Sequence, residues 1–305
     1  MIHRVVESSP GPRPDFPASP DPAACFAWCE AFVRSHHENF PVASWFLPAR
    51  LRPHICALYA FARLADDYAD EPAYAGRRAD ELDRWEDQLV RCYHGEPTRH
   101  PVFIALARTI STFDLPIAPM MDMLAAFRMD LTRRRYATFA ELMSYVERAA
   151  HPIGRLVLYV FGARDPASLR YGDELATALA LTSFWQDLRR DLQRDRLYLP
   201  IEDLRHFGVS EDDLREACAR GSSRPEITAL LRWETARARA HFERARPLLG
   251  RAPRELTVEL GLFWHGGRRA LEKIETRAGR LDGPRVRLNT VDKAAALARA
   301  LTHLR

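Results

Sequence analysis

The sequence is poor in lysine and lacks long apolar runs. Lys273 and Lys293 are the only lysines among 45 basic residues, so arginine carries nearly all the positive charge. Arginine suits bidentate phosphate recognition, although a genome-wide compositional bias explains the same count. No apolar run reaches the roughly 18 residues of a membrane-spanning helix, and the first residues lack the apolar core of a signal peptide. We therefore expect a soluble chain.

Cysteine is also scarce, and its spacing excludes two kinds of site. The five cysteines are odd in number and form no Cys-x-x-Cys pair; they are Cys25, Cys29, Cys56, Cys92 and Cys218. This pattern predicts reduced, mostly buried thiols in a cytoplasmic protein, and neither a disulfide framework nor a zinc site. The net charge of +4 is modest, and no segment concentrates it as a nucleic-acid-binding protein would.

Strand signals are missing, because the chain shows no convincing period-two alternation and no Asn-Gly hairpin turn. Helical patterns recur instead and predict an all-α protein. We expect a disordered, proline-rich leader over residues 1–22 and one all-α domain over residues 23–305. Helices are predicted at 22–36, 49–70, 77–94, 101–113, 118–132, 138–150, 156–161, 166–194, 225–246, 253–277 and 290–303. Thr138 and Ser210 are each predicted to cap a helix that follows. Pro152 and Gly154 are predicted to interrupt or kink the helix that begins at Thr138.

The stretch 59–71 places acidic residues one turn apart at the end of an apolar helix. Tyr59, Arg63, Asp66 and Asp70 fall near one helical face, with Asp67 beside them. Acids at i and i+4 repel one another on a bare helix, so this face is either solvated or neutralised by a cation. Carboxylate oxygens at this spacing suit Mg²⁺, which proteins usually hold through one or two carboxylates and substrate phosphate.

A second acidic stretch lies more than a hundred residues later. Ser183, Asp187 and Asp191 recur at i, i+4 and i+8, which places a hydroxyl and two carboxylates along one helical face over about 12 Å. If the two acidic helices face each other, they can hold metal ions that bridge to a diphosphate and assist its departure. The pair therefore favours metal–diphosphate chemistry over two solvated helix faces.

At these stretches the sequence resembles the squalene/phytoene synthase family of isoprenoid synthases. Arg196-Leu197-Tyr198-Leu199-Pro200 follows the second acidic motif as a similar tail does in the family. The run 127–131 is also similar, and Tyr145, Ala150 and Gly154 match a family helix in register. The resemblance covers nearly the whole chain after residue 25. It implies the isoprenoid synthase helical bundle around a central apolar cavity.

Three segments are most similar to the hydroxysqualene synthase branch of bacterial hopanoid biosynthesis. They are residues 37–44, 151–155 and 184–187, where members that condense two prenyl diphosphates usually have Arg-Asp in place of Gln186-Asp187. The branch implies that presqualene diphosphate ionises to a cyclopropylcarbinyl cation, which rearranges and is captured by water as hydroxysqualene. A condensing squalene- or phytoene-type synthase acting on farnesyl diphosphate or another prenyl diphosphate remains an alternative. So does a non-catalytic binding or assembly factor, although such relatives characteristically lose the metal acids.

The resemblance also implies roles for individual residues. The implied metal ligands are Asp66, Asp70, Ser183, Asp187 and Asp191, with Asp67 either a ligand or a neighbour. The implied catalytic residues are Tyr59, Arg63, Tyr145 and Asp187, and the implied substrate-binding residues are His36, Asn39, Phe40, Arg63 and Gln186. Arg63 could instead form an ion pair within its helix, and both tyrosines could be core aromatics.

Two residues depart from the family pattern, which commonly has Gln at Ala180 and Asn at Ser183. We hypothesise that a substrate with a single diphosphate needs fewer polar contacts here. The implied cofactor is Mg²⁺, with Mn²⁺ as a substitute, and NADPH is not expected. The implied partners are the enzymes that form presqualene diphosphate and reduce hydroxysqualene, and no nucleic acid is expected. The basic, amphipathic stretch 293–305 suits either peripheral contact with the inner face of the membrane or packing on its own domain.

Overall fold

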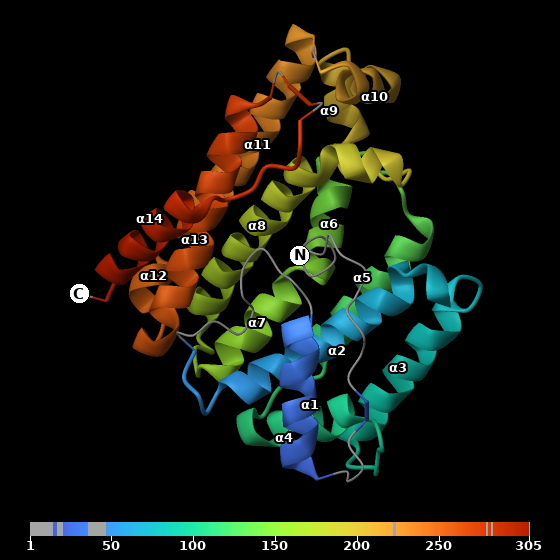
Figure 1. The fold of residues 1–305 in the computed structure, drawn as a ribbon, viewed down its shortest axis with the longest axis vertical. Coiled ribbons are helices and arrows are strands. Elements are labelled where there is room, and N and C mark those ends of the chain that lie inside the picture. Colours follow the sequence, from blue (N-terminus) through green and yellow to red (C-terminus); the bar gives the residue numbers. More distant parts are fainter. Residues whose placement is uncertain are drawn as a thin grey trace. The chain divides into compact units, whose positions relative to one another are not determined.

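The computed structural model describes residues 15–16, 21–35, 47–221, 224–278, 280–281 and 283–304. These residues form helices joined by turns and loops, and no strand occurs among them. The structure therefore confirms the predicted all-α class (Figure 1). The predicted leader over residues 1–22 falls largely outside the described residues.

The chain forms two compact units. The first comprises Met1–Thr132 and His151–Leu169, and the second Arg133–Ala150 and Arg170–Arg305. Two units can still belong to one domain, so the single domain over residues 23–305 stays a prediction.

The first unit is built around one buried helix, α2 (Arg52–Asp70), which contacts α1, α3, α4, α5 and α7. Every side chain from Ile55 to Asp67 is buried, which is typical of a helix surrounded by other helices. Its frequent alanines allow neighbours to approach, and Trp85 of α3 donates a hydrogen bond to the Phe61 carbonyl. The surrounding elements are α1 (Pro22–Ser35), η2 (Pro72–Tyr74), α3 (Arg78–Tyr93), α4 (Pro101–Phe113), α5 (Ala118–Thr132) and α7 (His151–Val160).

The second unit contains α8 (Pro166–Gln193) from Arg170 onward and the C-terminal helices. Its other elements are α6 (Phe139–Ala149), α9 (Ile201–His206), α10 (Glu211–Arg220), α11 (Pro225–Ala245), α12 (Leu248–Arg251), α13 (Arg254–Thr276) and α14 (Thr290–Thr302). Helix α13 contacts both α11 and α14 (Figure 1). A Cβ at Gly261 would lie 2.9 Å from the Cα of Ala300, so glycine is needed where α14 crosses α13. The stretch that begins at Lys293 therefore packs on its own unit.

Most predicted helices are confirmed, and their ends follow local chemistry. Ser210 and Asp213 form the full capping box of α10. Thr138 accepts from the Glu141 N–H, but the Glu141 carboxylate accepts from the Ala137 N–H instead of completing a box. The short elements η2, α9 and α12 were not predicted.

The predicted interruption at Pro152 and Gly154 was wrong. The break lies at Ala150, and α7 already begins at His151. Pro152 occupies the first turn of α7, where a missing N–H costs no helical hydrogen bond. The expected start of this helix at residue 156 is therefore corrected to residue 151.

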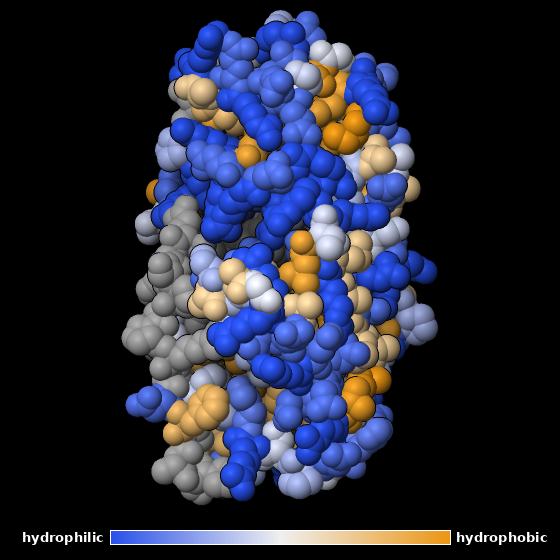
Figure 2. Space-filling model, turned by 90° about the vertical axis from the view of Figure 1, so that its right-hand side faces the viewer, coloured by the Kyte–Doolittle hydropathy of each residue, from blue (hydrophilic) through white to orange (hydrophobic). Residues whose placement is uncertain are grey.

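Among the described residues, none of the helices combines the length and apolar character needed to cross a bilayer. The face drawn in Figure 2 is mostly hydrophilic, and its apolar side chains form several separate groups.

Candidate functional site

The first acidic motif lies at the C-terminal end of α2, where its carboxylates are buried. Asp66 and Asp67 are 2% and 1% exposed. Arg63 is buried with them, and its Nη1 and Nη2 atoms lie 3.1 Å from Asp66 Oδ2 and 2.8 Å from Asp67 Oδ1. The ion pair proposed for Arg63 within the helix is thus present. A solvated acidic face is excluded for these two residues.

Negative charge accumulates where α2 ends. Asp70 is its last helical residue, half-buried, and Glu71 is the C-cap. Burial, and next the charge of Asp67, raise the pKa of the Glu71 carboxyl. The C-terminus of a helix carries a partial negative charge of its own. Arg63 offsets one of the three aspartate charges, and the remaining negative charge and this helix end favour a bound cation.

The second acidic motif lies near the end of α8, in the second unit. Ser183, Asp187 and Asp191 are all buried, and Asp187 is only 2% exposed. Leu181, Trp185 and Leu188 on the other side are buried as well. The helix is surrounded by protein on both faces, so these carboxylates also do not form a solvated face.

An arginine that the sequence analysis did not select neutralises Asp187. Arg285 Nε lies 2.6 Å from Asp187 Oδ1, and Arg285 Nη2 donates to Oδ2 at 2.8 Å. The neighbouring Gln186 side chain donates a hydrogen bond to the Val286 carbonyl. Burial, and next the charge of Arg194, lower the pKa of the nearby Arg190 guanidinium. The acids of this motif therefore lie in a strongly basic surrounding.

Tyr145 belongs to a buried aromatic cluster in the second unit. Its ring centroid lies 5.5 Å from that of Tyr136, 5.9 Å from that of Tyr198 and 6.3 Å from that of Phe184. Phe184 and Tyr198 stack at 4.4 Å. Phe184 follows Ser183 directly on α8, so the cluster adjoins the second acidic motif. Such rings offer π surfaces that attract cations.

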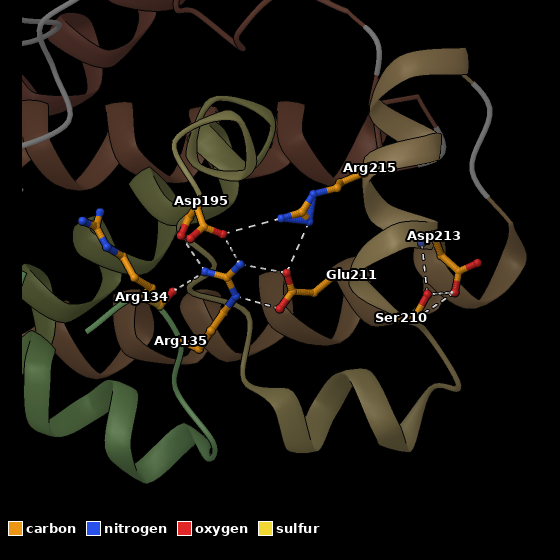
Figure 3. Close-up of polar contacts among 7 residues, drawn as sticks. All are labelled: Arg134, Arg135, Asp195, Ser210, Glu211, Asp213 and Arg215. Carbon is orange, nitrogen blue, oxygen red and sulfur yellow. Dashed lines mark hydrogen bonds and ion pairs between the residues drawn. The ribbon is translucent and has the colours of Figure 1, made fainter. Parts of the chain in front are cut away.

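A salt-bridge network holds the loop that follows the second acidic motif. Arg135 donates to Glu211 through Nε and Nη2 at 2.7 and 2.9 Å, and to the Asp195 carboxylate at 2.7 Å (Figure 3). Arg215 adds a contact to Glu211 at 3.3 Å. Asp195 has a φ of 56°, which turns the chain sharply out of α8. The Leu197 N–H then donates to the Arg134 carbonyl, which fixes the segment that carries Tyr198.

The predicted site residues divide between the two units. Tyr59, Arg63, Asp66 and Asp70 share α2, and Tyr59 is buried. Tyr145, Ser183, Gln186, Asp187 and Asp191 belong to the second unit. His36, Asn39 and Phe40 lie outside the described residues, and their roles stay predictions, as does the central apolar cavity.

Sequence reasoning missed Arg285 and gave no role to Tyr198. Tyr198 belongs to the tail 196–200 that supported the family resemblance, so a signal was present in the sequence. Arg285 stands in a loop between α13 and α14, 98 residues from Asp187. No local pattern marks it.

The donor set of the two motifs fits a hard divalent cation. Carboxylate oxygens and one hydroxyl are the protein ligands that Mg²⁺ prefers. Within the described residues, no group of three or more His, Cys, Asp or Glu side chains is arranged to hold a metal. Mg²⁺ needs only one or two carboxylates when a diphosphate supplies further oxygens, so the residues present fit it.

Comparisons with known proteins agree on one family. The model of the family described as squalene/phytoene synthase matches residues 33–292. A phytoene synthase from Arthrospira platensis is 34% identical over 70% of this chain and 72% of its own. A hydroxysqualene synthase from Rhodopseudomonas palustris is 35% identical over 58% of this chain and 60% of its own. The solved structure of the squalene synthase HpnC from Alicyclobacillus acidocaldarius has a TM-score of 0.79 and 38% identity, covering 84% of this chain and 95% of its own.

Proposed function

The chain belongs to the squalene/phytoene synthase family, and from this membership we propose that it converts presqualene diphosphate and water into hydroxysqualene and diphosphate. As a member of this family it is an enzyme that acts on prenyl diphosphates. The proposed reaction breaks one carbon–oxygen bond to diphosphate and forms one to water, so it needs no reductant.

The observation that carries this proposal is the residue before Asp187. Gln186 is uncharged, and its side-chain amide is engaged with the Val286 carbonyl. Members that condense two prenyl diphosphates usually have arginine at this position. One fewer cation beside the acidic motif suits one diphosphate better than two, because each diphosphate brings several negative charges. The hydroxysqualene synthase relative, 35% identical over 58% of this chain, supports the same branch.

The acidic motifs are the proposed cation-binding groups. Asp66 and Asp70 on α2, and Asp187 and Asp191 with Ser183 on α8, would hold Mg²⁺ through oxygen atoms. Bound Mg²⁺ would neutralise the diphosphate as it leaves. Because the described acids are largely buried, their charges are weakly screened. Arg63 would add a positive charge at the first motif, shared with Asp66 and Asp67.

The aromatic cluster around Tyr145 is proposed to face the reacting hydrocarbon. Tyr145, Tyr198 and Phe184 present adjoining rings, and such faces stabilise a developing carbocation without reacting with it. The Tyr145 hydroxyl is the polar group that would contact the departing diphosphate. Tyr59 is proposed for the same purpose on α2.

A condensing phytoene- or squalene-type synthase is the second candidate. The phytoene synthase relative is as similar as the hydroxysqualene synthase relative and covers more of the chain. Such an enzyme would use two prenyl diphosphates, and a squalene-forming one would also require a reduced nicotinamide.

Product analysis separates these candidates. The enzyme is incubated with Mg²⁺ and either presqualene diphosphate or farnesyl diphosphate, and the extracted products are identified by mass spectrometry. Hydroxysqualene from the first substrate and no product from the second is the expected result. Phytoene, squalene or presqualene diphosphate formed from two prenyl diphosphates would instead establish the condensing reaction.

A further inference from the structure

We propose that residues 283–288 form a strap that Arg285 and Gln186 attach to the second acidic motif. Binding of a divalent cation at Asp187 releases the strap from this motif. The strap precedes α14 in the connection from α13. The inference rests on the proposed function in one respect, that Asp187 is a ligand of the cation.

The strap is attached to two helices in different ways. On the α13 side, Arg277 donates to the Pro284 carbonyl at 3.3 Å and Lys273 donates to the Arg287 carbonyl at 3.1 Å. These bonds link the strap to the helix from which it emerges, and they do not involve the acidic motif. Loss of the other attachment would therefore leave the strap tethered to α13.

On the α8 side, the attachment uses the same carboxylate that is proposed to bind the cation. Arg285 engages both oxygens of Asp187 at 2.6 and 2.8 Å, and its side chain is 10% exposed. A buried carboxylate requires a positive partner, and Arg285 supplies it in the absence of metal. Gln186 donates a hydrogen bond to the adjoining Val286 carbonyl and so positions Arg285 for its contacts with Asp187.

Arg285 and a divalent cation compete for Asp187. A cation that coordinates either oxygen displaces the ion pair to Oδ1 or the charge-assisted hydrogen bond to Oδ2, and it places positive charge beside the guanidinium. Repulsion between the two cations then favours departure of Arg285. The hydrogen bond from Gln186 alone is a neutral one, and neutral hydrogen bonds are weaker than charge-assisted ones. Cation loading and release of the strap are thereby linked.

Limited proteolysis measures release of the strap directly. Trypsin cuts after Arg285 only when its guanidinium has left Asp187, because this side chain is 10% exposed and must enter the specificity pocket of the protease. The full-length protein is digested in EDTA, in MgCl₂ and in NaCl of equal ionic strength, without any prenyl substrate, and cleavage after Arg285 is followed by mass spectrometry. We expect Mg²⁺ to raise the cleavage rate by about tenfold, the effect of losing one charge-assisted hydrogen bond, and NaCl to leave it unchanged. An unchanged or slower rate in Mg²⁺ overturns the proposal.

Variants distinguish the strap from general loosening. Gln186→Ala and Arg285→Lys, which retain Asp187, should be cut faster in EDTA and respond less to Mg²⁺. Arg280→Ala removes a charge from the same connection but no contact with α8, and should behave as wild type. Equal Mg²⁺ responses in all three variants would also overturn the proposal.

The outcome is independent of the substrate assignment, because no prenyl diphosphate is present. If the enzyme makes hydroxysqualene but Mg²⁺ does not change the rate of tryptic cleavage, the proposed function stands and the strap proposal is wrong. If Mg²⁺ raises the cleavage rate but the enzyme makes phytoene, the strap proposal stands and the proposed substrate is wrong.

Discussion

Arg285 binds Asp187 through a two-pronged ion pair that joins residues 98 positions apart in the chain. The Nη2 contact is a charge-assisted hydrogen bond, and the Nε contact is an ion pair. The pair places a fixed positive charge on the acid that is most deeply buried in the second motif. Any metal cation that coordinates Asp187 must therefore compete with Arg285 for its carboxylate.

Replacement of this acid tests its proposed role in metal binding. We expect Asp187→Asn to lower kcat/KM for presqualene diphosphate by about 100-fold or more, because a ligand and its charge are lost together. Steady-state kinetics over a range of Mg²⁺ concentrations measures the effect. Asp212→Asn changes an exposed acid on α10 and should remain within about twofold of wild type. Equal kinetics for the two variants would remove Asp187 from the metal site.

Two substitutions separate catalysis from packing at Tyr145. Tyr145→Phe keeps the ring in its cluster, so we expect kcat to fall by about tenfold to 100-fold while unfolding changes by less than about 1.5 kcal/mol. Tyr145→Ala should also lower the free energy of unfolding, by about 3–5 kcal/mol. Kinetics and denaturant titration measure both quantities. Tyr136→Phe is the control from the same cluster, and if it matches Tyr145→Phe in kcat, Tyr145 is only a core aromatic.

The departures at Ala180 and Ser183 provide a third test. We expect the double substitution Ala180→Gln and Ser183→Asn not to raise turnover of presqualene diphosphate. Both positions are buried, so the larger side chains should also destabilise the protein by about 1–3 kcal/mol. A sharp rise in turnover would show that the native residues weaken the site instead of matching its substrate.

The buried Glu259 carboxyl should make the free energy of unfolding depend on pH, and this dependence is unrelated to catalysis. It is buried on α13, its Oε1 has no hydrogen-bond partner among the described residues, and burial raises the pKa of its carboxyl from 4.5 to about 7. The folded state therefore retains a proton that the unfolded state has lost between about pH 4.5 and 7. Across this range the free energy of unfolding falls as pH rises.

The substitution Glu259→Gln removes this titration. At pH 8 we expect the variant to be more stable than wild type by up to about 3 kcal/mol, and the difference should shrink toward pH 4.5. Denaturant titrations at several pH values measure it. Glu255→Gln, at an exposed position of the same helix, is the control. A difference that does not vary with pH would contradict the raised pKa.

Much of the fold could be predicted because helices are specified locally. The ends of α4 and α5 follow from Pro101, from the periodic apolar residues and from the turns that bound them, and the structure has them where they were predicted. Pro152 was misread because proline begins a helix as readily as it interrupts one. The sequence could not distinguish these cases without the conformation of Ala150.

In the candidate site, too, the features set by local sequence could be predicted and those set by packing could not. The sequence alone determined both acidic motifs, since acids one turn apart share a helical face regardless of what surrounds the helix. Only the tertiary structure decided that these acids are buried, that Tyr145 contacts Tyr198, and that Arg285 neutralises Asp187. These relationships join residues far apart in the chain, and they depend on how helices and loops pack. No periodic pattern within a single segment encodes them.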